Sequence, residues 1–195
     1  MTWRIHNNFP TIGLINVNII AETTPDEILN AVEQLQASGA DKFVLDLRDN
    51  GGGLLTAGVE TAKLFVNDGI ILQQQYRGEE VETFSSNAPG PLRDLPMVVL
   101  INKNTASAAE IIAGAIQVHT RAQLIGESTF GKDTIQLIFD LEDDSSLHIT
   151  AAKWWIPGIS PPISDQGLEP DIPIIQDDSE LDVTLQAAIQ ALIDG

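Results

Sequence analysis

Cysteine is absent from this 195-residue sequence. Catalysis by a thiol and zinc sites built from thiolates are therefore excluded, and cysteine usage gives no indication of the redox compartment. Histidine is scarce as well, since the chain has three, and no two of them show the spacing of metal ligands. We therefore predict neither a metal site nor a cofactor.

Basic residues are also few. Ten Lys and Arg stand against 28 Asp and Glu, which gives a formal net charge of −18 at pH 7. Such a surface repels phosphates, so nucleic acid and anionic membrane surfaces are disfavoured as partners. A cationic or neutral polypeptide is easier to accommodate.

Long apolar runs and a recognisable leader are missing too. No stretch of 18 consecutive apolar residues occurs, so no segment is predicted to span a membrane. The first six residues, Met-Thr-Trp-Arg-Ile-His, lack the basic and apolar regions of a signal peptide. This start fits a cytoplasmic protein and equally a trimmed piece of an exported one.

What the sequence does have is an alternation of apolar strands and amphipathic helices, in a chain that is 43% hydrophobic. Helices are predicted from Thr24, as the N-cap of a Thr-Pro-Asp-Glu capping box, and at 54–65, 108–118 and 181–193. Residues 78–95, which are polar, are predicted to be a loop or an excursion from the core. Strands are predicted at 12–20, 43–47, 70–76, 97–102, 122–125, 135–141 and 147–155, the last two as a hairpin. This order predicts an α/β fold of βαβ units with a mostly parallel sheet and with function at the carboxyl ends of its strands.

A serine stands at one such strand end. Ser107 follows the predicted strand 97–102 by five residues and precedes the helix that starts at Ala108. The first amides of a helix lack partners and favour negative charge, so the N–H of Ala108 is a natural donor to a tetrahedral oxyanion. A capping serine, with Glu110 completing a Ser-x-x-Glu box, explains the same pattern without any chemistry.

Two dozen residues later, Lys132 and Gln136 stand four positions apart. In a strand, Lys132, Thr134 and Gln136 share one face, so the glutamine could orient the lysine amine. A lysine can act as base to a serine only when it is uncharged, which requires an apolar environment because free lysine is protonated at neutral pH. A surface lysine at the junction of a loop and a strand is the alternative.

A third strand end carries the segment 46–53, Asp-Leu-Arg-Asp-Asn-Gly-Gly-Gly. Three glycines ahead of a helix let the backbone approach a ligand and present N–H groups to an anion. A phosphate cradle, a tight turn without a ligand and a second oxyanion donor are all compatible with this pattern, although Gly-x-x-x-x-Gly-Lys is absent. A Gly-x-Ser-x-Gly elbow is absent around Ser107, which weakens a hydrolase triad with His119 or His148.

In their order and spacing, these motifs resemble the carboxyl-terminal processing proteases, also called tail-specific proteases. The resemblance covers most of the chain from about Ile12 onward. It implies a crotonase-like (ClpP/crotonase) α/β core and a serine endopeptidase that cleaves polypeptides near their carboxyl termini through a Ser–Lys dyad and an acyl-enzyme intermediate. The segments that carry it are 46–53, 102–110 (Asn-Lys-Asn-Thr-Ala-Ser-Ala-Ala-Glu), 126–136 (Gly-Glu-Ser-Thr-Phe-Gly-Lys-Asp-Thr-Ile-Gln) and 167–171 (Gly-Leu-Glu-Pro-Asp).

By position in these motifs, the resemblance implies roles for five residues. Ser107 would be the nucleophile, Lys132 the general base and Gln136 its orienting partner, and the amides of Gly53 and Ala108 would form the oxyanion hole. No cofactor is implied. Members of this family are mostly exported, so the resemblance also implies an extracytoplasmic location, in a periplasm, a lumen or at the cell surface.

The sequence departs from the family pattern at its beginning. Family members usually carry a PDZ domain before the core, which binds the carboxyl terminus of the substrate. We expect residues 1–195 to be a single catalytic core domain without a PDZ domain, which is either cut away or naturally absent. The alternative to a peptidase is a non-catalytic module that binds peptides or lipids on the same fold, and the joint presence of Ser107, Lys132 and Gln136 argues against it.

Overall fold

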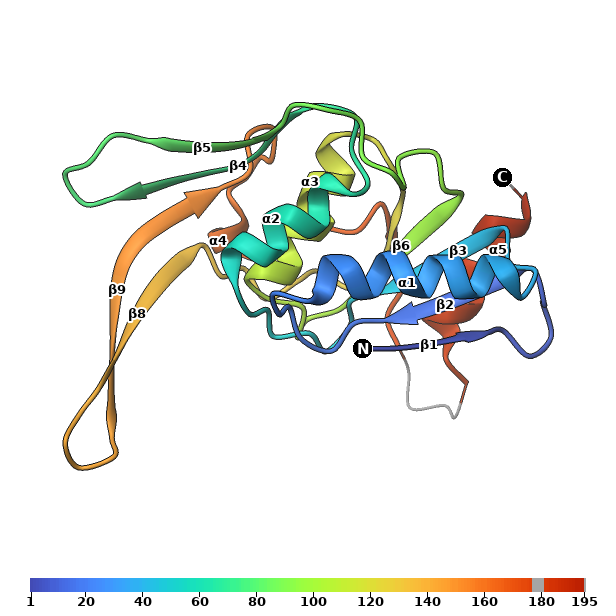
Figure 1. The fold of residues 1–195 in the computed structure, drawn as a ribbon, viewed down its shortest axis with the longest axis horizontal. Coiled ribbons are helices and arrows are strands. Elements are labelled where there is room, and N and C mark those ends of the chain that lie inside the picture. Colours follow the sequence, from blue (N-terminus) through green and yellow to red (C-terminus); the bar gives the residue numbers. More distant parts are fainter. Residues whose placement is uncertain (177–180, 195) are drawn as a thin grey trace.

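In the computed structural model, which describes residues 1–176 and 181–194, the strands form two sheets (Figure 1). The larger sheet has the order β1-β2-β3-β6-β7-β10, and every neighbouring pair is parallel except β1 and β2. Its strands are β1 (Thr2–Ile5), β2 (Ile12–Asn16), β3 (Lys42–Asp46), β6 (Met97–Ile101), β7 (Leu124–Gly126) and β10 (Ile172–Pro173).

Helices cover both faces of this sheet, which explains why its central strands are almost continuously apolar. In β3, for example, Phe43 and Leu45 belong to the core beneath the first three helices, whereas Val44 belongs to the core on the opposite face. The first face is covered by α1 (Thr24–Ala37), α2 (Leu55–Lys63) and α3 (Ala108–Val118), and the other by α5 (Val183–Asp194).

The second sheet is antiparallel and has the order β5-β4-β9-β8. Its β8–β9 hairpin leaves the body of the molecule close to the short helix α4 (Ile163–Gln166) and extends away from it (Figure 1). We name the outer part of this hairpin, residues 136–150, the arm. The strands of this sheet are β4 (Gly69–Tyr76), β5 (Glu82–Ser86), β8 (Thr134–Asp140) and β9 (Ser146–Trp155).

The predicted α/β class, the mostly parallel sheet and the pairing of β8 with β9 are confirmed. The hairpin, however, belongs to a separate antiparallel sheet, and it is followed in the chain by β10 and α5. Among the described residues, no helix is long and apolar enough to cross a membrane.

Three local predictions are wrong. Residues 78–95 are not a loop throughout, because β5 pairs with β4 in this region. The strand predicted at 12–20 ends at Asn16, because the chain then turns toward the glycine segment, where the amide of Ile20 donates to the carbonyl of Gly52. The N-cap of α1 is Thr23, because the hydroxyl of Thr24 accepts a hydrogen bond from the amide of Ala21 instead of capping the helix.

Candidate active site

The loops that follow the parallel strands meet at the carboxyl edge of the larger sheet. The loop after β6 is bound to the loop after β3, since the amide of Ala106 donates to the carbonyl of Asn50 at 2.9 Å. The loop after β7 is also bound to the loop after β6, since the amide of Phe130 donates to the carbonyl of Thr105 at 2.9 Å. Ser107, the glycine segment and Lys132 therefore lie on three loops, and the loop that carries Ser107 is hydrogen-bonded to each of the other two.

Ser107 has an unusual backbone conformation. It is the N-cap of α3, with φ 56° and ψ −121°. A positive φ is strained for a residue other than glycine, and such strain occurs preferentially at functional sites. The side chain is half-buried. In the described part of the chain, the N–H of the next residue, Ala108, has no hydrogen-bond partner.

The glycine segment packs against this serine. Asn50 is fully buried and fixes the turn, because its side chain donates to the carbonyl of Val17 at 2.6 Å and accepts from the amide of Gly52 at 2.9 Å. At Gly52, where φ is 98°, a Cβ would lie 2.8 Å from the Cβ of Ser107 and 3.0 Å from the nitrogen of Ala108. Only glycine permits so close an approach.

Gly53, the second of the predicted oxyanion donors, packs against the loop after β2. A Cβ at this glycine would lie 1.9 Å from the carbonyl oxygen of Ile20. The residue is exposed, and its N–H makes no hydrogen bond with the part of the chain that is described. Within residues 1–176 and 181–194, the N–H groups of Gly53 and Ala108, the two donors predicted for the oxyanion hole, thus have no hydrogen-bond partner.

A buried carboxylate, that of Glu110, joins the serine loop to the lysine loop. Its Oε2 accepts hydrogen bonds from the amides of Ser107 at 2.7 Å and Lys132 at 3.0 Å. Because both bonds end on one atom, these two nitrogens lie within about 6 Å of each other. Its Oε1 accepts from the hydroxyl of Thr129 at 2.5 Å and from the amide of Gly131 at 2.8 Å. One side chain thus sets the backbone positions of both predicted dyad residues.

The environment of Glu110 has opposing effects on its protonation. Burial raises the pKa of this carboxyl group, and the hydrogen bonds from Thr129, Gly131, Ser107 and Lys132 oppose the rise because they stabilise the ionised form. In the sequence, a buried carboxyl group of this kind is indicated by a glutamate that stands among apolar residues of a predicted helix. The capping pattern predicts its bond to Ser107, whereas its other bonds depend on how the 127–133 loop folds over α3.

The side chains of Ser107, Lys132 and Gln136 are not hydrogen-bonded to one another. In the described residues, the Lys132 amine makes no hydrogen bond or ion pair, and the exposed amide group of Gln136 makes none either. The sequence predicts that Lys132, Thr134 and Gln136 share one face of a strand. Because β8 begins at Thr134, Lys132 lies before the strand, and only Thr134 and Gln136 share that face. Catalytic hydrogen bonds are often long without substrate. The role of Gln136 stays a prediction.

Neither His119 nor His148 is hydrogen-bonded to Ser107 in the described residues. His119 is the C-cap of α3, about 18 Å along the helix from Ser107, and its Nε2 lies 3.0 Å from the carbonyl oxygen of Ile70. His148 lies on the arm, 2.9 Å from the hydroxyl of Ser146. Residues 1–176 and 181–194 also contain no cluster of three His, Asp or Glu side chains that could hold a metal ion.

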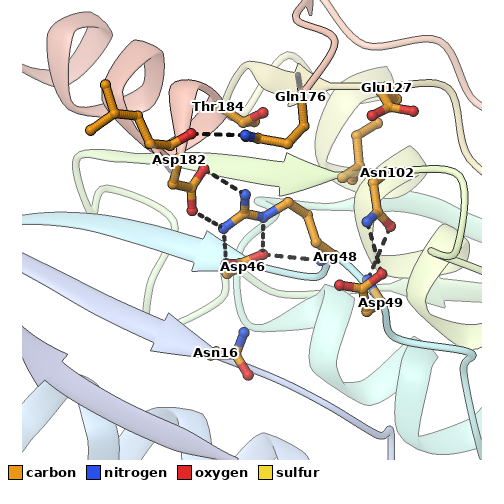
Figure 2. Close-up of a pocket in the computed structure, with 11 residues that line it drawn as sticks. Asn16, Asp46, Arg48, Asp49, Asn102, Glu127, Gln176, Asp182 and Thr184 are labelled. Atoms are coloured by element: carbon orange, nitrogen blue, oxygen red, sulfur yellow. Dashed lines mark hydrogen bonds and ion pairs between the residues drawn. The ribbon is translucent and has the colours of Figure 1, made fainter. Parts of the chain in front are cut away.

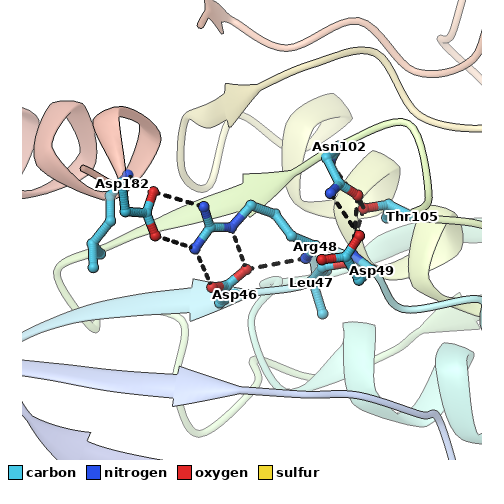
Figure 3. A network of polar contacts seen from close by, with 8 residues as sticks. Asp46, Leu47, Arg48, Asp49, Asn102, Thr105 and Asp182 are labelled. Atoms are coloured by element: carbon cyan, nitrogen blue, oxygen red, sulfur yellow. Dashed lines mark hydrogen bonds and ion pairs between the residues drawn. The ribbon is translucent and has the colours of Figure 1, made fainter. Parts of the chain in front are cut away.

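A polar cavity of about 420 Å³ lies along the same edge, between the loop after β3 and the start of α5 (Figure 2). Arg48 crosses one side of it and binds two carboxylates. Its guanidinium donates to Asp46 at 2.9 and 2.7 Å and to Asp182 at 2.8 Å through each of two nitrogens (Figure 3). Burial disfavours the charge of Arg48, but the bonds to Asp46 and Asp182 outweigh this effect and raise its pKa. Likewise, burial opposes the ionisation of Asp182, yet its bond to Arg48 leaves its pKa lowered.

Asp49 secures the loop that leads to Ser107. It accepts a hydrogen bond from the side chain of Asn102 at 2.9 Å (Figure 3). It accepts another from the side chain of Asn104 at 2.7 Å. The bonds from Asn104 and Asn102 lower the pKa of Asp49. The hydroxyl of Thr105 also donates to the carbonyl of Leu47 at 2.8 Å. The sequence patterns give no role to these residues, whose partners are distant in the chain.

Comparison with known proteins places this chain in a family. The profile of peptidase family S41 matches residues 11–174. The chain belongs to peptidase family S41. The matched region of the S41 chain contains Gly53, Ser107, Ala108, Lys132 and Gln136.

Relatives of this S41 chain include proteins named carboxyl-terminal processing proteases. One from Picosynechococcus sp. is 41% identical over 192 residues, which cover 95% of this chain and 46% of that protein. The chloroplastic carboxyl-terminal-processing peptidase 1 of Arabidopsis thaliana is 36% identical, over 86% of this chain and 34% of that protein. The chain thus spans less than half the length of these relatives.

A solved structure entitled photosystem II D1 C-terminal processing protease has the same architecture. It aligns with a TM-score of 0.74 and 32% identity, covering 93% of this chain and 46% of that one. The α/β fold with a mostly parallel sheet and a second antiparallel sheet is therefore that of an S41 protease.

Proposed function

We propose that this chain is the catalytic core of a serine endopeptidase of the carboxyl-terminal processing type. The observation that carries the proposal is the bond of one Glu110 oxygen to the amides of both Ser107 and Lys132. This arrangement holds the backbone of a strained serine, at a helix N-terminus, close to the backbone of a lysine whose amine makes no hydrogen bond or ion pair in the described residues. A nucleophile and a base need this proximity to react together.

In the proposed reaction, Lys132 takes the proton of Ser107 Oγ, which attacks the carbonyl carbon of a peptide bond. The N–H groups of Ala108 and Gly53 stabilise the oxyanion of the tetrahedral intermediate, helped by the N-terminus of α3. The lysine ammonium then protonates the leaving amine, and an acyl-enzyme remains on Ser107. Water, deprotonated by Lys132, hydrolyses this ester. Gln136 orients the lysine amine.

The substrates are proposed to be polypeptides with apolar side chains near the cleavage point. Three large apolar side chains are exposed on loops that join the site: Ile19 is 63% exposed, Leu54 53% and Phe130 67%. The amide of Phe130 donates to the carbonyl of Thr105, two residues before Ser107. Leu54 follows the glycine segment, which packs against Ser107 at Gly52. Its amide donates to the carbonyl of Ile20, next to Ile19. Exposed apolar groups at a site of this kind favour apolar ligands.

We also propose that residues 1–195 form one catalytic core domain on the crotonase-like fold and that substrate capture by a PDZ domain lies outside it. An extracytoplasmic location is proposed for the protein. It is supported by the family resemblance and by the chloroplastic designation of the Arabidopsis relative.

The dyad is tested by cleavage of an unstructured peptide with an apolar carboxyl end. We expect Ser107→Ala and Lys132→Ala each to lower kcat by about 10³-fold or more, because a nucleophile and its base act as one unit. Lys103→Ala, which removes an exposed lysine from the neighbouring loop, is the matched control and should retain activity. Activity of the native chain should rise into the alkaline range, as a lysine base requires. Equal activity of all four proteins would contradict the dyad.

A further inference from the structure

The apolar face of the arm has no covering partner in the described residues. Cross-strand partners in an antiparallel hairpin lie on the same face. Leu137 pairs with Ile149 and Phe139 with Leu147, and Leu141 lies next to the turn. Each of these five side chains is between 43% and 48% exposed. The opposite face of the arm carries the pairs Gln136 with Thr150, Ile138 with His148 and Asp140 with Ser146, so five of these six residues are polar.

The same face is buried at the base of the hairpin. Ile135 pairs with Ala152, and both lie on the face that continues with Leu137. Ile135 packs on the main core, while Ala152 and Trp154 are buried. One apolar face therefore runs from the core outward along the arm. The arm itself extends past the body of the molecule (Figure 1). An exposed apolar ribbon of this kind is a site for another chain, because such surfaces otherwise aggregate.

The outer end of the arm is acidic, which restricts the kind of chain that fits. Asp140, Glu142, Asp143 and Asp144 are exposed, and residues 136–150 contain no Lys or Arg. A second copy of this chain would bring an identical acidic end and a net charge of −18 toward the first, and like charges oppose that association. A polypeptide with apolar side chains and neighbouring Lys or Arg residues complements both features.

The arm begins beside the candidate dyad. β8 starts two residues after Lys132 and is an edge strand of its sheet. Since a strand rises ~3.3 Å per residue, about seven extended residues of a bound chain run the length of β8. A polypeptide that enters the site can therefore lie along the apolar face of the arm at the same time.

We propose that the arm is a second binding surface for the polypeptide substrate, taking an apolar stretch followed by basic residues that lies several residues from the scissile bond. This inference rests on the proposed peptidase function, because it assigns the arm to that substrate. Apolar contacts along β8 and β9 supply affinity, and the acidic end selects for positive charge.

The first test compares a short peptide, which covers the cleavage site alone, with two longer ones. Each longer peptide carries about eight added residues, apolar at alternate positions and ending in two lysines, on the amino or the carboxyl side. For each longer peptide, we divide its kcat/KM by that of the short peptide. In the double variant Phe139→Ser/Leu147→Ser, we expect this ratio to fall about tenfold from its native value for the longer peptide whose added residues reach the arm. Ser146→Ala/His148→Ala, on the polar face, should keep the native ratio. Leu137→Ser repeats the test at another pair if the double variant does not fold.

A second test measures binding without cleavage. In a Ser107→Ala background, the Kd of a fluorescent longer peptide should rise about tenfold, or ~1.4 kcal/mol, with Phe139→Ser/Leu147→Ser. Glu142→Lys/Asp144→Lys should weaken binding of the peptide that ends in lysines and strengthen binding of one that ends in glutamates.

The outcomes separate this inference from the proposed function. If Ser107→Ala abolishes cleavage but the arm variants leave both the ratio and the Kd unchanged, the peptidase stands and the arm proposal is overturned. If no peptide is cleaved but the arm variants weaken binding, the arm binds polypeptides and the peptidase proposal fails. A native dimer that dissociates in Phe139→Ser/Leu147→Ser would overturn the proposal in favour of a second copy.

Discussion

At the scale of single residues, Glu110 contributes most to the candidate active site. It is a charged side chain that the fold buries completely, and burying a charge is costly unless hydrogen bonds compensate. Four donors from two loops provide that compensation, and none of them is a charged group. The carboxylate therefore works as a fixed acceptor that holds the serine and lysine loops together.

Glu110→Gln should disturb both stability and activity. The amide NH₂ would face N–H donors that now bind a carboxylate oxygen, so at least two buried donors would lose their acceptor. We expect a loss of about 2–3 kcal/mol in the free energy of unfolding and at least a tenfold fall in kcat/KM, because Ser107 and Lys132 would shift relative to each other. Urea unfolding and peptide cleavage measure the two effects. Glu33→Gln, on the exposed side of α1, is the control, and equal behaviour of the two variants would show that Glu110 does not position the dyad.

At the scale of elements, the site depends on how closely the β3–α2 turn approaches the start of α3. Asn50 links this turn to the end of β2 through Val17, and its carbonyl binds the loop before Ser107. Gly52 then fills the remaining space with backbone alone. The turn and the helix N-terminus are thus one packed unit, and any added atom between them must displace Ser107 or Ala108.

Two neighbouring glycines test this packing. Gly52→Ala should cost about 2 kcal/mol or more, because φ is positive and the new Cβ meets the carbonyl oxygen of Ala106 at 2.8 Å. Peptide cleavage should fall along with stability, since the serine loop has to move. Gly51→Ala should change the melting temperature and the activity very little, because a Cβ there meets nothing within 4 Å. Similar melting temperatures for the two variants would rule out the close approach.

At the scale of the whole molecule, the carboxyl-terminal helix is tied to the middle of the chain. α5 covers one face of the larger sheet with Ala188, Ile189 and Leu192. Just before this helix, Asp182 binds Arg48, 134 positions earlier in the sequence, and also accepts from the amide of Leu185. The pair joins the last helix to the loop that carries the glycine segment.

Asp182→Asn should reveal this link through its dependence on pH. Because the pKa of Asp182 is lowered in the folded chain, its stabilising effect is present above the unfolded value near ~3.9 and is lost as the pH falls through the folded value. At pH 7 we expect the variant to melt about 2–4 °C below the native chain, a modest change because the pair is partly exposed to solvent. The difference should shrink below about pH 4.

Asparagine is chosen because its side-chain oxygen can still accept the hydrogen bond from the amide of Leu185, which caps the start of α5. The exposed Asp41→Asn is the control, and a difference that is constant from pH 7 to pH 3 would contradict the charge pair.

Much of this architecture is encoded locally. The apolar runs at 43–47 and 97–102 and the helix at 108–118 follow from periodicity, and the structure has them within a residue or two. The short edge strands β1 and β10 carry too few residues for periodicity to reveal them. β5 is hidden in a polar segment because it is held by its pairing with β4, which no local pattern contains.

The candidate site divides in the same way. Ser107, Lys132, Gln136, Gly53 and Ala108 could be nominated from the sequence, because motifs with a fixed order and spacing survive as local strings of residues. The bonds of Glu110 to the lysine loop, the closeness of Gly52 to Ser107 and the exposure of the arm could not, because each is a contact between segments that meet only when the chain folds. The sequence alone determined which chemical groups this protein has at its strand ends. The tertiary structure decided which of them lie together, since the packing of β3, β6 and β7 side by side brings their loops to one edge.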